Sequence, residues 1–392
     1  MLYNKKFIWS YSTIEVTLIF VHIVYFFTYG YSLKSWESAG ILSRELKIFD
    51  KLIEDFGLKF TFVTYGNHKD KEFNLNKNIK IVPIYSLIKK SENKYKNLFR
   101  SFKVPKLLKN EIGNFDVIKQ NQLLGCWVSI LLKLNSKKPL YTRTGYDMFL
   151  FSLKEKKSIF KKISYYLLTQ LALIFSNIYS ITNNLDSLFL KKYFLVNKNK
   201  LVIRPNWVSN ENHKNFKSRY ENKILSVGRL EKQKNFEYLI KCLVNTNLTL
   251  DIVGSGSEKE NLEKITENLS VDINFLGTVE NNQLLKLMTE YKYFVSSSLF
   301  EGNPKAILEA MASGCVVIAK EIPNNVEIIN NKVNGILFNE SSISLKSILK
   351  NIKILSDQQN LSQNGIEYVK KNNSIEALAN NIYQDIQLIT FK

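Results

Sequence analysis

Two carboxylates, Glu301 and Glu309, lie close together in the stretch LFEGNPKAILEAMASGCVVIA. If a helix begins after Pro304, its rise of about 1.5 Å per residue puts the two acids roughly 8 to 10 Å apart. That separation is about the width of a diphosphate, and a helix N-terminus favours a bound anion. The pair would then accept hydrogen bonds from hydroxyl groups on either side of the diphosphate. The alternative is two solvated glutamates on a surface helix.

The residues between and after these acids predict a loop, a helix and a buried strand. Asn303 is expected as the N-cap, and Pro304 as the first helical residue, where a missing N–H costs nothing. Gly314 is expected to end the helix in a left-handed conformation. The β-branched run CVVIA then reads as a parallel strand that is covered on both faces.

Further glycines and two cations follow strand-like runs in the second half of the chain. The run SVGRLEKQKN places Gly228, Arg229 and Lys234 after one strand. Gly254 follows the next strand in IVGSG, and Gly277 follows a third in FLGTV. Ligands of open α/β sheets bind at the carboxyl ends of strands, so these residues are candidates for one site. Each glycine alone is weak evidence, because tight turns need glycine anyway.

Strand-like and helix-like segments alternate along the whole chain, which predicts an α/β protein with parallel, doubly wound sheets. The alternation pauses at the polar run RPNWVSNENHKNFKSRY and then restarts. We therefore expect two Rossmann-like domains, at residues 1–205 and 206–372. Residues 373–392 are expected to form a terminal helix that packs back on the first domain.

The second half resembles family four of the retaining, nucleotide-sugar-dependent glycosyltransferases, which have the GT-B fold of two facing Rossmann-like domains. The resemblance runs from about Asn206 to Phe338. It rests on GRLEKQKN, the GSG turn, FLGTVENNQLLKLM, SLFEGNPKAILEAMASG and NNVEIINNKVNGILF, in the order of the family.

The resemblance implies roles for single residues. Arg229 and Lys234 would hold the diphosphate of the donor, for which a planar guanidinium and a compact ammonium are suited. Glu309 would bind the ribose hydroxyls, and Glu301 would contact the transferred sugar. The implied catalytic residues are Arg229, Lys234 and Glu301. The implied donor-binding residues are Gly228, Arg229, Lys234, Gly254, Gly277, Gly302, Asn303, Pro304 and Glu309.

The first half matches the family less closely. The run SWESAGILSREL stands where the family carries a glycine-rich loop, and only Gly40 remains as a candidate for close backbone approach. Many relatives carry a histidine after a middle strand of this domain, whereas His22, His68 and His213 lie elsewhere. Gln122, Arg143 or Asp147 is a candidate for the acceptor or sugar side, and turn chemistry is the alternative for each.

The net charge of +20 is concentrated in the first half. Residues 1–200 hold 33 basic and 14 acidic residues, against 22 and 21 in residues 201–392. The densest segment, LKEKKSIFKKISYYLLTQLALIF, mixes lysines with aromatic residues and is expected as a helix on anionic lipid headgroups. A core helix with a solvated basic start is the alternative.

The cysteines and the N-terminus bear on the compartment. Cys126, Cys242 and Cys315 are odd in number and widely spaced, which favours a reducing environment over a disulfide or metal framework. The apolar run from Val16 to Tyr29 is too short to span a bilayer and is expected as a buried first strand. A membrane-touching segment is the alternative. We expect a cytoplasmic protein on the inner face of the cell membrane.

The expected reaction is metal-independent, retaining transfer of a hexose-type sugar from a UDP- or GDP-linked donor, with no cofactor. The chain contains no Asp-x-Asp motif for a metal-bridged diphosphate. The expected acceptor is a lipid-linked saccharide of surface polysaccharide synthesis, such as lipopolysaccharide or capsule. Same-fold alternatives are a sugar-nucleotide epimerase and a phosphorylase. A basic nucleic-acid-binding protein is the alternative from another class, although no nucleic-acid motif is present and no nucleic acid is expected.

Overall fold

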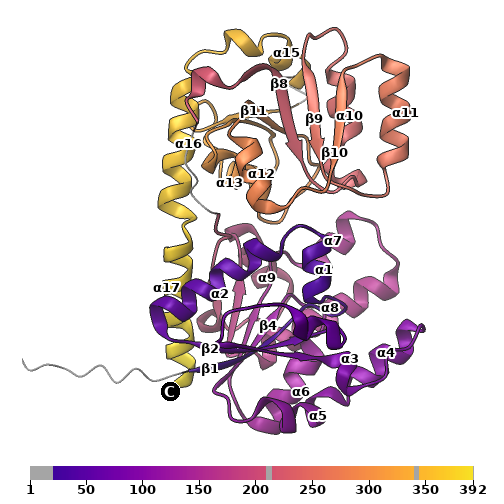
Figure 1. Ribbon diagram of the computed structural model, residues 1–392, viewed down its shortest axis with the longest axis vertical. Helices are drawn as coiled ribbons and strands as arrows, with labels where there is room; N and C mark the ends of the chain where they lie inside the picture. Colours follow the sequence, from indigo (N-terminus) through magenta and orange to yellow (C-terminus); the bar gives the residue numbers. More distant parts are fainter. Residues whose placement is uncertain (1–20, 209–213, 340–343, 392) are drawn as a thin grey trace, which may run out of the picture.

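The computed structural model describes residues 21–208, 214–339 and 344–391. These residues form two sheet domains that are stacked end to end, with the N-terminal domain below the C-terminal domain in Figure 1. Every strand pair is parallel, and helices cover both faces of each sheet. The prediction of two doubly wound parallel sheets is therefore confirmed.

The N-terminal sheet has seven strands in the order β3-β2-β1-β4-β5-β6-β7. Its strands are β1 (His22–Phe26), β2 (Lys59–Thr64), β3 (Ile79–Pro83), β4 (Val117–Asn121), β5 (Leu140–Arg143), β6 (Ile178–Ile181) and β7 (Leu201–Ile203). Its helices are α1 (Leu33–Ser38), α2 (Leu42–Phe56), α3 (Ile84–Leu87), α4 (Lys94–Ser101), α5 (Val104–Ile112), α6 (Cys126–Ser136), α7 (Met148–Lys154), α8 (Ile159–Phe175) and α9 (Asn184–Tyr193). The expected strand from 16 to 29 contains β1, and residues 16–20 lie outside the described residues.

The C-terminal sheet has six strands in the order β10-β9-β8-β11-β12-β13. Its strands are β8 (Tyr220–Val227), β9 (Thr249–Val253), β10 (Ile273–Gly277), β11 (Tyr291–Ser296), β12 (Val316–Lys320) and β13 (Ile336–Phe338). Its helices are α10 (Phe236–Cys242), α11 (Lys259–Leu269), α12 (Asn281–Met288), α13 (Lys305–Ala312), α14 (Pro323–Val326), α15 (Leu345–Lys350) and α16 (Gln358–Asn372).

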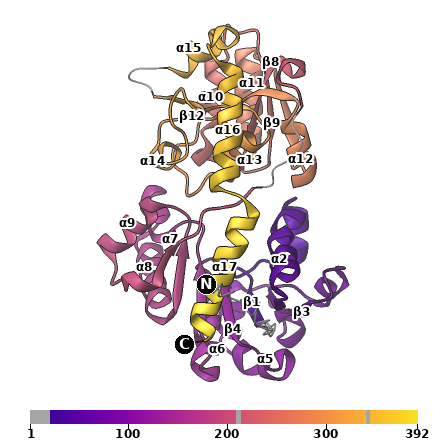
Figure 2. The same ribbon diagram turned by 90° about the vertical axis from the view of Figure 1, so that its left-hand side faces the viewer.

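The last helix, α17 (Ile375–Thr390), leaves the C-terminal domain and packs on the N-terminal one (Figure 2). Its buried apolar residues join a core with β1, β2 and α2, and Phe56 of α2 stacks on Tyr383 at 4.1 Å between ring centroids. The chain therefore crosses between the domains twice. The crossings touch, because Val208 N–H donates to the Asn373 carbonyl at 3.0 Å.

The described elements differ from the expected ones in two places. Pro304 occupies the N-cap position of α13 and the helix begins at Lys305, so the prediction of Asn303 as N-cap is wrong. The basic segment after residue 153 is divided between α7 and α8 instead of forming one helix. Lys156 takes a left-handed conformation with φ of 51°, which interrupts the helix there. The left-handed stop at Gly314 is confirmed by its φ of 77°.

Candidate functional site

A cleft of about 1330 Å³ lies between the two domains. The C-terminal wall is formed by the loops that follow β8 and β11 and by the start of α13. The N-terminal wall is formed by α2, the ends of β4 and β5, and the α7 region. Ligands of open parallel sheets bind where strands end, so the geometry makes this cleft the candidate active site.

Lys234 and Glu301 meet on the C-terminal wall. The Lys234 ammonium donates to a Glu301 carboxylate oxygen at 2.5 Å, and both side chains are largely buried. The Lys234 side chain lies against Gly228, where an added Cβ would come within 3.0 Å of the lysine Cε atom. Gly228 thus leaves room for the lysine to reach the cleft. The structure brings together these three predicted residues from two different loops.

Arg229 lies beside this pair and is exposed to the cleft. Its guanidinium makes no hydrogen bond or ion pair with any residue that the structure describes. Burial raises the pKa of Tyr146 on the opposite wall, and the Arg229 charge opposes that shift. Arg229 is therefore within electrostatic reach of the N-terminal wall and is available to an anion in the cleft.

Gly254 and Gly277 do not line the cleft. They lie behind the loop that contains Gly228. Gly254 N–H donates to the Gly277 carbonyl at 2.7 Å. A Cβ on Gly254 would lie 1.9 Å from the Gly228 carbonyl oxygen, so only glycine fits there. Gly254 thus has a packing role, whereas Gly277 supplies a carbonyl acceptor and has open space where a side chain would lie.

Glu309 lies on α13 with 3% of its surface exposed. Asn281 donates to its carboxylate at 3.1 Å, and Arg44 of the N-terminal domain donates at 3.4 Å. The sequence predicts that this buried carboxylate has partners, and these two side chains are the partners in the structure. Asn281 and Arg44 therefore donate to the same carboxylate that, by the resemblance, would accept hydrogen bonds from the ribose hydroxyls.

A second ion pair crosses the domains close to Glu309. Lys305, at the start of α13, donates to Glu45 of α2 at 3.2 Å, and Glu45 also pairs with Arg44 at 3.1 Å. Burial would raise the pKa of Glu45, but the Lys305 and Arg44 cations lower it to about 2. Sequence reasoning missed this cluster, because Arg44 and Glu45 read as polar positions of an amphipathic helix.

The loop of Gly302, Asn303 and Pro304 joins the two walls. The Gly302 carbonyl accepts from Asn183 at 3.4 Å and from Asn324 at 2.6 Å. The Asn303 carbonyl accepts from Asn206 at 3.2 Å, while its buried side-chain oxygen has no partner among the described residues. The three residues line the cleft at the point where its walls meet.

Of the residues predicted for the acceptor side, Gln122 and Arg143 line the cleft. Gln122 has a left-handed φ of 64°, and its side-chain oxygen accepts from Gly145 N–H at 3.0 Å. Asp147 instead caps α7, accepting from Leu150 N–H at 2.7 Å, and burial raises its pKa to about 6. Gly40 approaches the C-terminal domain, where its carbonyl accepts from Asn281 N–H at 3.0 Å.

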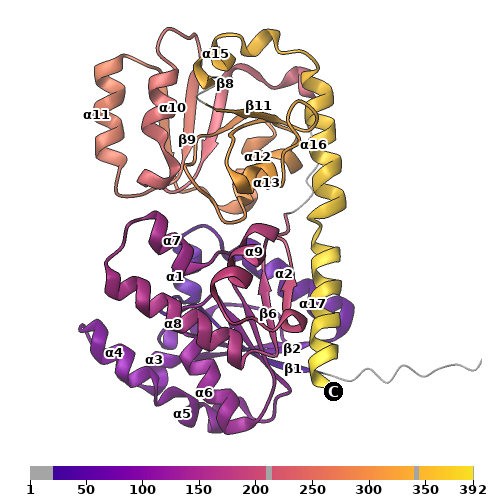
Figure 3. The same ribbon diagram turned by 180° about the vertical axis from the view of Figure 1, so that it is seen from behind.

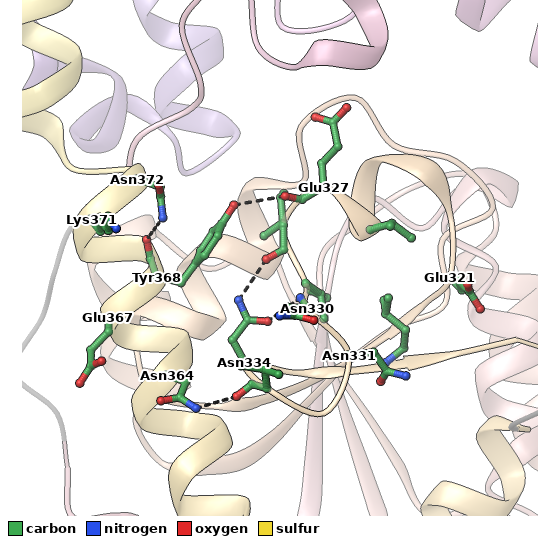
Figure 4. A pocket seen from close by; sticks show the side chains of 15 residues that line it. Glu321, Glu327, Asn330, Asn331, Asn334, Asn364, Glu367, Tyr368, Lys371 and Asn372 are labelled. Carbon is green, nitrogen blue, oxygen red and sulfur yellow. Dashed lines mark hydrogen bonds between the residues drawn. The ribbon is translucent and has the colours of Figure 1, made fainter.

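A second hollow of about 720 Å³ lies in the C-terminal domain, beside α16 (Figure 4). Its side chains mostly bond within the hollow: Tyr368 donates to the Glu327 carbonyl, and Asn364 donates to the Val333 carbonyl. The Glu327 carboxylate accepts from the backbone N–H groups of Asn184 and Leu185 at the start of α9. The Glu327 carboxylate thus links the rim of this hollow to the N-terminal domain.

In the parts of the chain that the structure describes, no histidine lines the cleft. No group of three or more His, Cys, Asp or Glu residues within these ranges is placed to hold a metal ion. Cys126, Cys242 and Cys315 are buried. No helix in the described ranges is long and apolar enough to cross a membrane.

Comparisons with known proteins agree with this geometry. The sucrose-phosphate synthase of Thermosynechococcus elongatus has the same fold, with a TM-score of 0.74 and 16% identity over 94% of this chain and 98% of that one. The fold and the cleft define a protein of the GT-B class. Residues 208–372 match the family model "Glycosyl transferases group 1". The assignment to family four stays a prediction.

Two curated relatives extend the likeness. The capsular polysaccharide biosynthesis glycosyltransferase CapH of Staphylococcus aureus is 29% identical over 67% of this chain and 75% of its own length. A Campylobacter jejuni N-acetylgalactosaminyltransferase, named for a diphospho-undecaprenol-linked substrate, is 31% identical over 35% of this chain and 40% of its own length. Matches to three further relatives span only 31%, 30% and 43% of those proteins.

Proposed function

We propose that this protein is a retaining glycosyltransferase that moves a hexose-type sugar from a nucleotide-diphosphate sugar to a saccharide acceptor. The observation that carries the proposal is that Lys234, Glu301 and Arg229 line the interdomain cleft near the start of α13. Among the described residues, the Arg229 guanidinium has no partner. These groups suit a diphosphate with a sugar attached. The match of residues 208–372 to the group 1 model of the glycosyl transferases supports the proposal.

The chain contributes binding, orientation and charge to the reaction. Arg229 and Lys234 stabilise the negative charge that develops on the leaving diphosphate, and the start of α13 presents N–H groups to it. Glu301 holds the Lys234 ammonium in place and faces the sugar. The acceptor hydroxyl attacks on the face that the diphosphate leaves, and the departing phosphate takes its proton. The mechanism needs no protein general base and no metal ion.

The acceptor proposed here is a lipid-linked saccharide of surface polysaccharide synthesis. The printed names of CapH and of the Campylobacter jejuni transferase describe such a pathway and such a substrate for those proteins. The donor is UDP- or GDP-linked, and no cofactor is involved. A lipid-linked acceptor requires the cleft to open close to a membrane surface.

The helices beside the cleft offer a surface for that membrane. Helix α8 exposes an apolar stripe next to the lysines of the α7–α8 connection, and α4 lies on the same side of the domain (Figure 3). The exposed apolar side chains of these helices are Tyr95, Phe99, Ile159, Phe160, Ile163, Leu167, Leu171 and Ile174. Such a basic and aromatic face suits anionic lipid headgroups. We therefore propose peripheral binding to the cytoplasmic face of the cell membrane.

Vesicle flotation tests this surface. At low salt, the wild-type protein should float with phosphatidylglycerol vesicles. A much smaller fraction of it should float with neutral phosphatidylcholine vesicles. Neutralising the five lysines from 154 to 162 should release it. Neutralising five exposed lysines of the C-terminal domain, Lys264, Lys286, Lys346, Lys350 and Lys370, is the matched control. Equal flotation of both variants would refute the membrane surface.

Thermal stabilisation by a panel of nucleotide sugars tests the function and selects the donor. A donor should raise the melting temperature, and incubation with a lipid-linked acceptor should give a glycosylated product. An epimerase would convert the donor without transferring it. A nucleic-acid-binding protein would retain DNA or RNA in a filter assay, with the steep salt dependence of phosphate contacts. Either result without sugar transfer would replace the proposal.

A further inference from the structure

Two cations, the buried Lys119 and the partly buried Arg143, lie on the N-terminal wall of the cleft. Lys119 of β4 is paired in register with Tyr141 of β5, and Asn121 is paired with Arg143. Side chains alternate between the faces of a strand, so Lys119 and Arg143 project from the same face of the sheet. Both residues line the cleft.

Lys119 lacks a hydrogen-bond partner among the described residues, although only 4% of its surface is exposed. Its ammonium lies 3.5 Å from the centroid of the Tyr141 ring. A ring face attracts a cation but replaces none of the three hydrogen bonds that an ammonium makes in water. Burial, with the neighbouring Arg143 charge, lowers the pKa of Lys119 to about 7. The fold therefore keeps this lysine at a cost.

Arg143 also lacks an acidic partner within the described residues. Its guanidinium donates to two neutral oxygens, the Arg204 carbonyl at 3.0 Å and the Asn206 side chain at 3.2 Å. These contacts orient the guanidinium without neutralising its charge.

The acids nearby are already paired with other cations. Both oxygens of Asp385 accept from Arg204, at 2.9 and 2.6 Å, and one also accepts from the Tyr141 hydroxyl. Glu45 pairs with Arg44 and Lys305. Among the described residues, Lys119 and Arg143 are thus left without a carboxylate to balance them, and one of the two is buried while the other is partly buried. A buried charge without a counter-ion is costly, and an anionic ligand would supply the counter-ion.

We propose that Lys119 and Arg143 form an anion subsite for a carboxylate or phosphate group of the acceptor. The assignment to the acceptor rests on the proposed function, because the donor diphosphate has Arg229 and Lys234 on the opposite wall. The anion is either the carboxylate of an acidic sugar or the phosphate of the lipid carrier. The two sources share the chemistry that Lys119 and Arg143 recognise.

Calorimetric titration of the full-length protein separates these sources. The first arm compares methyl glucuronide with neutral methyl glucoside, and the second compares farnesyl phosphate with farnesol. UDP is kept saturating in both arms, so that the donor site is filled. We expect one anion to bind the wild-type protein, and Lys119→Met to weaken that binding roughly tenfold or more. Lys292→Met, which removes a buried lysine outside the cleft, should bind like the wild type.

The melting temperature of each variant shows whether a loss of binding comes from a failure to fold. Removing an uncompensated buried cation should raise the melting temperature of Lys119→Met above that of the wild type. The proposal is overturned if neither anion binds better than its neutral match, or if Lys119→Met binds the anion as tightly as the wild type. UDP and GDP titrations report separately on the donor site. If neither nucleotide binds, the proposed function fails, and both anion arms are repeated without UDP to test the subsite by itself.

Discussion

The two walls of the cleft neutralise their cations in different ways. On the C-terminal wall, Lys234 is paired with Glu301 of its own domain at 2.5 Å. On the N-terminal wall, Lys119 and Arg143 have no acidic partner among the described residues. The C-terminal wall is a nearly complete site, whereas the N-terminal wall is balanced only when an anion is added. We infer that the donor meets a preformed site and that the acceptor brings part of its own electrostatic balance.

The largest expected effect is on the C-terminal wall. Lys234→Ala or Arg229→Ala should cost roughly 2 to 4 kcal/mol in the transfer step, because each removes a cation from the developing charge of the leaving group. The turnover number at saturating donor measures this loss. Lys241→Ala, which removes an exposed lysine paired with Glu237, should leave turnover unchanged. Near-normal turnover of both cleft variants would contradict the assignment.

Glu309 tests the contact between the walls. Glu309→Ala should weaken binding of the donor by about 1 to 3 kcal/mol, since it removes a buried acceptor of hydrogen bonds. Titration with UDP and GDP measures the change. Arg44→Met leaves the carboxylate in place and should weaken nucleotide binding less. If Arg44→Met costs more than Glu309→Ala, the carboxylate serves only to hold the domains together.

The pH dependence of stability tests whether the charged Lys119 side chain destabilises the fold. Its pKa in the fold is about 7, below the ordinary value of 10.5, so the folded protein disfavours the charged form. The penalty is fully present below pH 7 and disappears as the pH rises towards 10.5. Lys119→Met should therefore be more stable than the wild type by about 1 to 2 kcal/mol at pH 7, and the difference should shrink by pH 10.

Arg143 and Asp385 are the charged groups that act on Lys119, from β5 and α17. They are present in both proteins, so the difference between the two denaturation curves isolates the lysine. A gain in stability that stays constant from pH 7 to pH 10 would show that Lys119 is not a charged, uncompensated group.

The smallest expected effect concerns the membrane face. Phe160 is 82% exposed, so Phe160→Ser should cost little in folding and about 1 kcal/mol or more in partition to anionic vesicles. Flotation at several salt concentrations measures the partition. Leu276→Ser, at an exposed apolar position of the C-terminal domain, is the matched control. If the two variants partition to the vesicles equally, α8 is not part of the surface that binds the membrane.

The C-terminal wall was largely predictable from the sequence, because its chemistry is local. Lys234 and Gly228 lie in one turn after a strand, and Glu301 lies in a turn after another strand of the same sheet. Parallel strands deliver such turns to one edge, so their meeting follows from the order of the elements. The α13 start was wrong by one residue, since proline suits either site at a helix beginning, and Gly254 and Gly277 lie behind the cleft wall.

The N-terminal wall was predictable only in outline. From the sequence, the lysine of KQN is expected near the end of a strand with its side chain in solvent. In the structure, Lys119 is the central residue of β4 and is buried. One of the charged groups that act on it, Asp385, belongs to α17 and comes from the far end of the sequence. The pairing of Arg44 with Glu309 likewise depends on how the domains face each other. Such contacts leave no spacing in a single sequence, because they join segments that are far apart in it.

A crystal structure of the complex with UDP or GDP tests the central claim most directly. We predict a diphosphate that contacts the Arg229 guanidinium and the Lys234 ammonium at the start of α13, with the ribose next to Glu309. A nucleotide bound elsewhere, with these side chains turned away from it, would contradict the account.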